Sequence, residues 1–201
     1  MSGEIVRSFA SPGNLPAGIA FDGKFLWNCD YTNNKIYQLD IDGNIIRSFA
    51  SPQNLPFGMA CDGRYLWVGN YTNSRIHQLD MDGNIIQFFS APVFGYNSFA
   101  FDGKSLWLVY SAAATIYQLD MDGNIISTFS LLVSNPWGLA FDGKSFWACD
   151  DVANKIYQLN LEGNIIQSFA SPGATPYGLA FDNEYLWNCD DTDNKIYQLV
   201  R

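Results

Sequence analysis

The sequence has few charged residues and very few basic ones. Only 15% of its 201 residues are charged, and 11 Lys and Arg stand against 20 Asp and Glu, which gives a net charge of −9. Nucleic acids and anionic lipid surfaces are bound through clustered Lys and Arg. The composition therefore argues against nucleic acid and against a membrane as partners.

Histidine and long apolar stretches are also scarce. The one histidine, His77, is too few for His-based zinc sites, for Ser-His-Asp triads and for His-assisted lyase chemistry. No apolar run approaches the roughly 20 residues that a membrane span requires. The N-terminus, MSGEIVRSFA, lacks the apolar region of a signal peptide. We expect a soluble protein, and these features do not fix its compartment.

An internal repeat of 40 residues dominates the sequence. Five copies follow one another without insertions, beginning at Gly3, Gly43, Gly83, Gly123 and Gly163. Each copy divides into four short β-type segments bounded by turn signals, which in the first copy are GIAFD, KFLWNCD, KIYQLD and NIIRSFA. An Asp-Gly pair between the first two is typical of a hairpin turn. Four antiparallel strands in every 40 residues are typical of a propeller blade.

The repeat predicts an all-β fold, a five-bladed β-propeller that forms a single domain over residues 1–201. The chain begins in a fourth strand (residues 4–9) and ends after a third (residues 195–199). The N-terminal strand can therefore complete the last blade, which leaves no blade half-built. In this arrangement the repeated tryptophans, such as Trp27, lie mid-strand and should form the core between blades.

The four cysteines show no CxxC spacing. Three of them, Cys29, Cys149 and Cys189, take equivalent positions in separate copies, and Cys61 replaces a first-strand Phe. Equivalent positions in different blades stand around a ring, so Cα separations below about 7 Å, as a disulfide needs, are not expected. We expect buried free thiols, which favours a reducing, cytoplasmic compartment.

The repeat resembles the NHL type. In the first copy the resemblance is carried by Pro16, Gly18, Ala20, Asp22, Gly23, Trp27, Asp30, Asn34, Lys35, Ile36 and Asp42-Gly43. It implies a propeller fold, although five blades depart from the six that are usual for the family. It implies no single function, because relatives of this kind include protein-binding modules, RNA-binding modules, lyases and lactonases.

Positions that differ among the copies are expected around one mouth of the central channel, on the top face. The residue before the first-strand Gly reads Ala17, Phe57, Asn97, Trp137 and Tyr177. The loops after the second strands bring together an acidic arc of Asp30, Asp150, Asp151, Asp190, Asp191 and Asp193. Side chains that vary on one rim of a repeated scaffold indicate a binding surface. The predicted ligand-binding residues are Phe57, Asn97, Trp137, Tyr177, Asp30, Asp150 and Asp190.

A structural explanation of the same residues stays open. The aspartates could cap turns by accepting backbone N–H bonds, and the aromatic side chains could plug a narrow pore. The repeated aspartates of the Asp-Gly turns need no function beyond the turn. His77 stands where the other copies have Tyr, on a packed strand, so a Tyr-to-His drift explains it.

Three functions compete. The first is a monomeric, non-catalytic binding propeller that engages a small polar ligand, a glycan or a peptide at the top face, without a cofactor. The second is a lactonase- or lyase-like enzyme with Ca²⁺ held by the acidic arc, as the resemblance suggests. Ca²⁺ takes about 6–8 oxygen ligands, and Glu4, Glu162 and Glu184 all lie away from the top face. The third is an engineered or recently amplified repeat protein without a known role.

Overall fold

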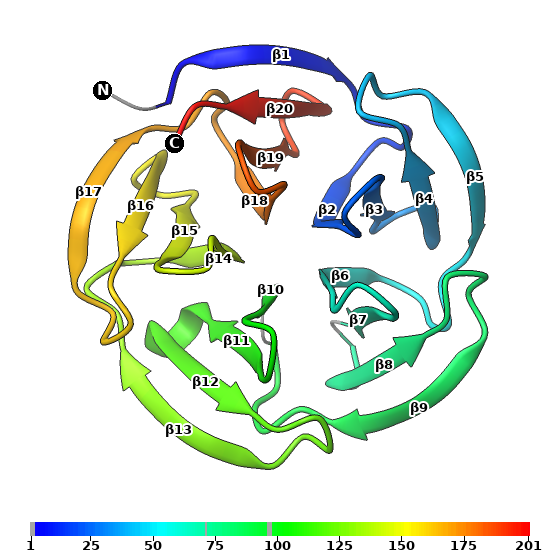
Figure 1. The fold of residues 1–201 in the computed structure, drawn as a ribbon, viewed down its shortest axis with the longest axis horizontal. Helices are drawn as coiled ribbons and strands as arrows, with labels where there is room; N and C mark the ends of the chain where they lie inside the picture. The colour runs from blue at the N-terminus through cyan, green and yellow to red at the C-terminus, as the bar shows by residue number, and fades with distance from the viewer. Residues whose placement is uncertain (1–2, 71, 96–97) are drawn as a thin grey trace.

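Five four-stranded antiparallel sheets stand in a ring around a central channel (Figure 1). The structure is a computed structural model that describes residues 3–70, 72–95 and 98–201. It confirms the predicted five-bladed β-propeller. Four of the blades are each built from four strands that follow one another in the chain, and the first of them lies innermost.

The strands keep nearly the same bounds from blade to blade. Blade one holds β2 (Pro16–Phe21), β3 (Leu26–Asp30), β4 (Lys35–Leu39) and β5 (Ile45–Ala50). Blade two holds β6 (Pro56–Cys61), β7 (Leu66–Asn70), β8 (Arg75–Leu79) and β9 (Ile85–Ser90). Blade three holds β10 (Ser98–Phe101), β11 (Leu106–Tyr110), β12 (Thr115–Leu119) and β13 (Ile125–Ser130), with a short 3₁₀ turn, η1 (Ser111–Ala113). Blade four holds β14 (Pro136–Phe141), β15 (Phe146–Asp150), β16 (Lys155–Leu159) and β17 (Ile165–Ala170).

The last blade is closed by the N-terminal strand, as predicted. It holds β18 (Pro176–Phe181), β19 (Leu186–Asp190), β20 (Lys195–Leu199) and β1 (Ile5–Ala10). The pairing of β1 with β20 is antiparallel, with Phe9 opposite Ile196. The two ends of the chain lie close together in Figure 1. No helix in the described residues is long and apolar enough to cross a membrane.

The inner strands approach one another closely around the channel. A Cβ atom on Gly138 of β14 would lie 2.5 Å from the Tyr177 carbonyl oxygen of β18, which is far too close for any side chain. The glycine therefore allows neighbouring blades to pack backbone against backbone. Blade three has Ser98 at the equivalent position, and its inner strand β10 is the shortest of the five.

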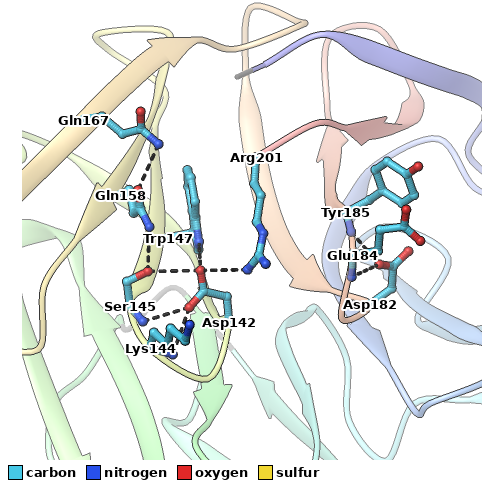
Figure 2. A network of polar contacts seen from close by, with 10 residues as sticks. All are labelled: Asp142, Lys144, Ser145, Trp147, Gln158, Gln167, Asp182, Glu184, Tyr185 and Arg201. Carbon is cyan, nitrogen blue, oxygen red and sulfur yellow. Dashed lines mark hydrogen bonds and ion pairs between the residues drawn. The ribbon is translucent and has the colours of Figure 1, made fainter. Parts of the chain in front are cut away.

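A hydrogen bond couples each Asp-Gly turn to the core tryptophan of the same blade. The tryptophans are almost fully enclosed, as predicted. In blade four, Trp147 Nε1 donates to Asp142 Oδ2 at 2.9 Å, and the backbone N–H groups of Lys144 and Ser145 donate to Asp142 Oδ1 (Figure 2). The other four blades repeat the bond, from Trp27 to Asp22, Trp67 to Asp62, Trp107 to Asp102 and Trp187 to Asp182. The Asp-Gly pattern predicts the turn and does not predict the bond to the indole.

These turns form what we call the lower face, opposite the mouth at which the inner strands begin. Arg201, near the end of the last blade, reaches across to Asp142 of blade four at 3.2 Å (Figure 2). Arg7 and Arg47 likewise pair with an aspartate in the turn of the next blade, Asp42 and Asp82. Ion pairs on the lower face therefore link neighbouring blades.

The cysteines are free thiols, as expected. Cys189 Sγ accepts the backbone N–H of Gly178 at 3.2 Å and lies 3.5 Å from the carbonyl oxygen of Ala17 in the next blade. Burial raises the pKa of Cys189 to about 12. Cys29 and Cys149 make the same contacts. These thiols bridge inner strands and are too poorly ionised to act as nucleophiles.

Candidate functional site at the upper mouth of the channel

Three of the predicted rim residues meet at the upper mouth. Trp137 and Tyr177 stack with ring centroids 4.8 Å apart. Phe57 contacts both, at 5.2 Å from Trp137 and 5.7 Å from Tyr177. The fourth varying residue, Ala17, is too short to join them, and Asn97 lies outside the described residues. In the described residues, aromatic side chains of three blades therefore meet at the mouth, and blade one leaves a gap beside them.

A cavity of about 240 Å³ opens at this gap. Its walls are Leu15, Tyr31, Phe57, Trp137 and Tyr177. Tyr31 meets Phe57 edge-on, with centroids 5.8 Å apart. Phe57 is 5% exposed, whereas Trp137 and Tyr177 are only half-buried. Phe57 thus forms the packed floor, and the two other rings present a face to whatever enters.

The structure turns three of the predicted ligand residues inward, which differs from the sequence prediction. Asp30, Asp150 and Asp190 have no exposed surface. Asp150 Oδ2 accepts the N–H groups of Ser134 and Asn135 from the loop that leads into β14, both at 3.1 Å. Its Oδ1 accepts two more from the loop after β15. The carboxylate therefore links two loops by capping their backbone N–H groups.

Equivalent aspartates position the cavity walls in blades one and five by the same kind of hydrogen bond. Asp30 accepts the N–H of Leu15 at 2.9 Å, and Tyr31 N–H in turn donates to the Leu15 carbonyl at 3.0 Å. Asp190 accepts the N–H of Thr175 at 2.8 Å, just before β18. These aspartates are therefore positioning residues for the mouth.

Asp151 and Asp191 follow these aspartates and take, in blades four and five, the position that Tyr31 takes in the cavity wall of blade one. Burial and then the charges of Asp191 and Asp151 raise the pKa of Tyr177 to about 12. Burial also raises the pKa of Asp151, although Asn135 Nδ2 donates to its Oδ1 at 2.5 Å. The pKa of Asp191 is raised by burial and by the charge of Asp190.

Sequence reasoning placed Asp151 and Asp191 in the acidic arc and predicted contact with ligand for the residue before each. Two adjacent strand-end residues point to opposite sides, so one of each pair faces the loops and the other faces the mouth. Variation among the copies does not separate them, since the position of Asp150 also holds Asn70 and Tyr110, and the position of Asp151 also holds Tyr31 and Ser111.

The Trp137 indole is the most informative single group at the mouth. Its Nε1 is buried and makes no well-formed hydrogen bond within the described part of the chain. It is close enough to Asp151 to lower the pKa of that carboxyl, against the stronger effect of burial. His77 takes no part in the cavity: it is enclosed in β8, with its ring 5.5 Å from that of Phe88.

The lower end of the channel has different walls. A cavity of about 70 Å³ is lined by the carboxyl-terminal halves of the five inner strands, which each supply an alanine. The other lining residues are apolar apart from the Cys61 thiol. Over residues 3–70, 72–95 and 98–201, no group of three His, Cys, Asp or Glu side chains could hold a metal ion.

Comparison with solved structures supports the repeat-level resemblance. A glutaminyl cyclase from Myxococcus xanthus matches at 11% identity with a TM-score of 0.85, over 98% of this chain and 95% of that one. This chain has an NHL-like β-propeller fold. A catalytically inactive virginiamycin B lyase from Staphylococcus aureus, solved with quinupristin, matches at 24% identity and a TM-score of 0.58, over 96% of this chain and 68% of the lyase.

A propeller of a nidogen/laminin complex matches at 21% identity and a TM-score of 0.61, over 82% of this chain and 67% of that one. No family model and no curated protein matches the sequence. Identities this low establish the fold and leave the activity to be argued from the site.

Proposed function

We propose that this protein is a non-catalytic binding propeller that holds a small polar ligand at the upper mouth of its channel. The observation that carries the proposal is the 240 Å³ cavity, whose walls come from positions that differ among the five repeats. Varying side chains on a rigid scaffold are where proteins commonly place recognition.

A purely structural plug explains the mouth less well. The five equivalent positions at the mouth have similar surroundings. Side chains that only filled the pore would therefore be the same in every blade, as the alanines at the lower end are. Instead the mouth holds Ala17, Phe57, Trp137 and Tyr177, and two of these rings stay half-buried. Concave aromatic walls with a few polar groups at the edge are typical of ligand sites.

The structural neighbours are compatible with this function. One was solved with the small molecule quinupristin, and another belongs to a complex of two proteins. Small molecules and peptides are both candidate ligands for this chain on that ground.

The direct test observes the Trp137 indole N–H by NMR while a panel of small sugars, cations, anions and dipeptides is added. Trp137 is one of six tryptophans, and the other five are enclosed between blades. We expect a binding compound to move the Trp137 signal and to leave the other five in place. A panel in which no compound moves that signal would contradict the proposal.

Catalysis at the same mouth is the second candidate, and the raised pKa values of Asp151 and Asp191 favour it. A carboxyl that keeps its proton nearer to neutral pH can act as a general acid. One neighbour is named as a glutaminyl cyclase, so a peptide beginning with Gln is the substrate to try. We expect no ammonia release above background, and release that Asp151→Asn abolishes would favour the enzyme.

The metal-dependent alternative has its own test. Bound Ca²⁺ would raise the melting temperature by mass action. We expect no rise at millimolar calcium, because the oxygens of Asp150 and Asp190 already accept backbone N–H bonds. A rise of several degrees that Asp150→Asn or Asp190→Asn removes would favour a calcium enzyme.

A further inference from the structure

Aromatic faces make up most of the wall of the upper cavity. Tyr31, Phe57, Trp137 and Tyr177 supply four rings, and Leu15 supplies the remaining wall. The face of an aromatic ring carries negative partial charge and attracts a cation within about 6 Å of its centre. The rings contact one another, with centroids 4.8–5.8 Å apart, so they form one continuous aromatic wall against which a bound group would lie.

Two carboxyl groups add negative charge at the edge of the cavity. Asp151 and Asp191 take, in blades four and five, the position that Tyr31 takes in the cavity wall of blade one, and an ionised carboxylate can only accept hydrogen bonds. Within the described part of the chain, neither forms an ion pair with Lys or Arg. The ion pairs found there join Arg7 to Asp42, Arg47 to Asp82 and Arg201 to Asp142, all on the lower face.

We propose that the upper cavity binds a small organic cation, with an alkylammonium group held between the aromatic rings and the carboxylates of Asp151 and Asp191. The inference rests on the proposed function, because it names the ligand class of the same cavity. The net charge of −9 also favours the approach of a cation.

The size and polarity of the cavity limit the cation. A volume of about 240 Å³ falls below the roughly 300–1,000 Å³ of pockets for drug-sized ligands. It therefore takes a head group of few heavy atoms, such as a quaternary ammonium on a short chain. A neutral sugar would gain nothing from the negative ring faces and the net charge of −9, which both favour a cation.

The test compares choline with 3,3-dimethylbutan-1-ol by isothermal titration calorimetry. The alcohol has the shape of choline with carbon in place of the charged nitrogen, so the pair isolates the charge. We expect choline to bind at least tenfold more tightly, since a desolvated cation–π contact is worth about 2 kcal/mol. Asp151→Asn and Asp191→Asn should each weaken choline binding by roughly tenfold.

Matched variants separate the site from the rest of the surface. Asp122→Asn removes one negative charge from an exposed turn on the lower face and should leave choline binding unchanged. Ala17→Phe gives blade one the side chain that blade two has, which should fill the gap and abolish binding. Because Ala17 is buried, the folding of this variant is checked by its melting curve. Tyr31→Ala removes one wall without overpacking and should weaken binding several-fold.

The outcomes distinguish the cation inference from the proposed binding function. Equal binding of choline and its neutral analogue would overturn the cation inference and leave a ligand site in place. Choline binding that survives both aspartate variants would overturn the assignment to this cavity. No choline binding at about 10 mM, well above a millimolar dissociation constant, would overturn the inference. Movement of the Trp137 signal by another compound in the panel would then preserve the binding function.

Discussion

The two ends of the central channel are built from the same five strands and differ in almost every other respect. At the lower end, five alanines and their apolar neighbours line a space of about 70 Å³. At the upper end, the repeat positions at the mouth carry different side chains from blade to blade, around a cavity of about 240 Å³. The lower end repeats the same packing in every blade, whereas the side chains at the upper end differ among the blades. This difference is why we place the proposed ligand site at the upper end.

Loss of the N-terminal strand should have the largest effect, because it disrupts the ring at both ends of the channel. Deletion of residues 1–9 removes β1, leaves β20 without a partner on one side and uncovers Trp187, whose ring lies 6.0 Å from that of Phe9. We expect a loss of several kcal/mol out of the roughly 5–15 kcal/mol of a typical domain. Urea unfolding measures the loss. An unchanged midpoint would show that the ring does not depend on this closure.

A pair of tryptophans sharpens the comparison. Trp147→Ala empties the core of blade four and should cost about 3–5 kcal/mol. Trp137→Ala removes a half-buried ring from the upper mouth and should cost only about 1–2 kcal/mol. Ligand affinity should behave in the opposite way, with a loss of roughly tenfold for Trp137→Ala alone. Equal destabilisation by the two variants would make Trp137 a core residue.

A pair of aspartates makes the same contrast with a smaller effect. Asp142→Ala leaves the Trp147 indole and two backbone N–H groups without their acceptor, which should cost about 1–3 kcal/mol. Asp151→Ala should stay within about 0.5 kcal/mol of the parent and should weaken binding of a cation. Chemical denaturation with calorimetry on the same samples measures both. A stable Asp142→Ala variant would remove the structural role given to the lower face.

The sequence predicted the ring, the four strands of each blade, the closure by the N-terminal strand and the core tryptophans, because each is a repeated local pattern. It also located the mouth, where Phe57, Trp137 and Tyr177 come together. It could not separate Asp150 from Asp151, since which of two adjacent carboxyls turns inward depends on backbone N–H groups some 15 residues earlier. The cavity itself is lined by side chains from four blades, which only the fold brings together.

The smallest effect expected concerns pH and His77, which stands where the other four copies have tyrosine. Burial and the nearby Arg75 lower the pKa of His77, so the unfolded chain binds a proton more readily than the folded one. Stability that is present above the unfolded pKa, near 6.5, is therefore lost as the pH falls through the lower folded value. His77→Tyr restores the residue of the other four copies. Its melting temperature should exceed that of the parent by more at pH 5 than at pH 8, and an equal difference would exclude a buried neutral His77.

The measurement that tests the central claim most directly is a crystal structure of the protein soaked with a small organic cation such as choline. The account predicts electron density in the upper cavity, against Trp137 and Tyr177 and beside Asp151 and Asp191. It predicts no density in the alanine-lined space at the lower end. Density at the lower end, or an upper mouth filled by the rings of Trp137 and Tyr177 with no room for a ligand, would contradict it.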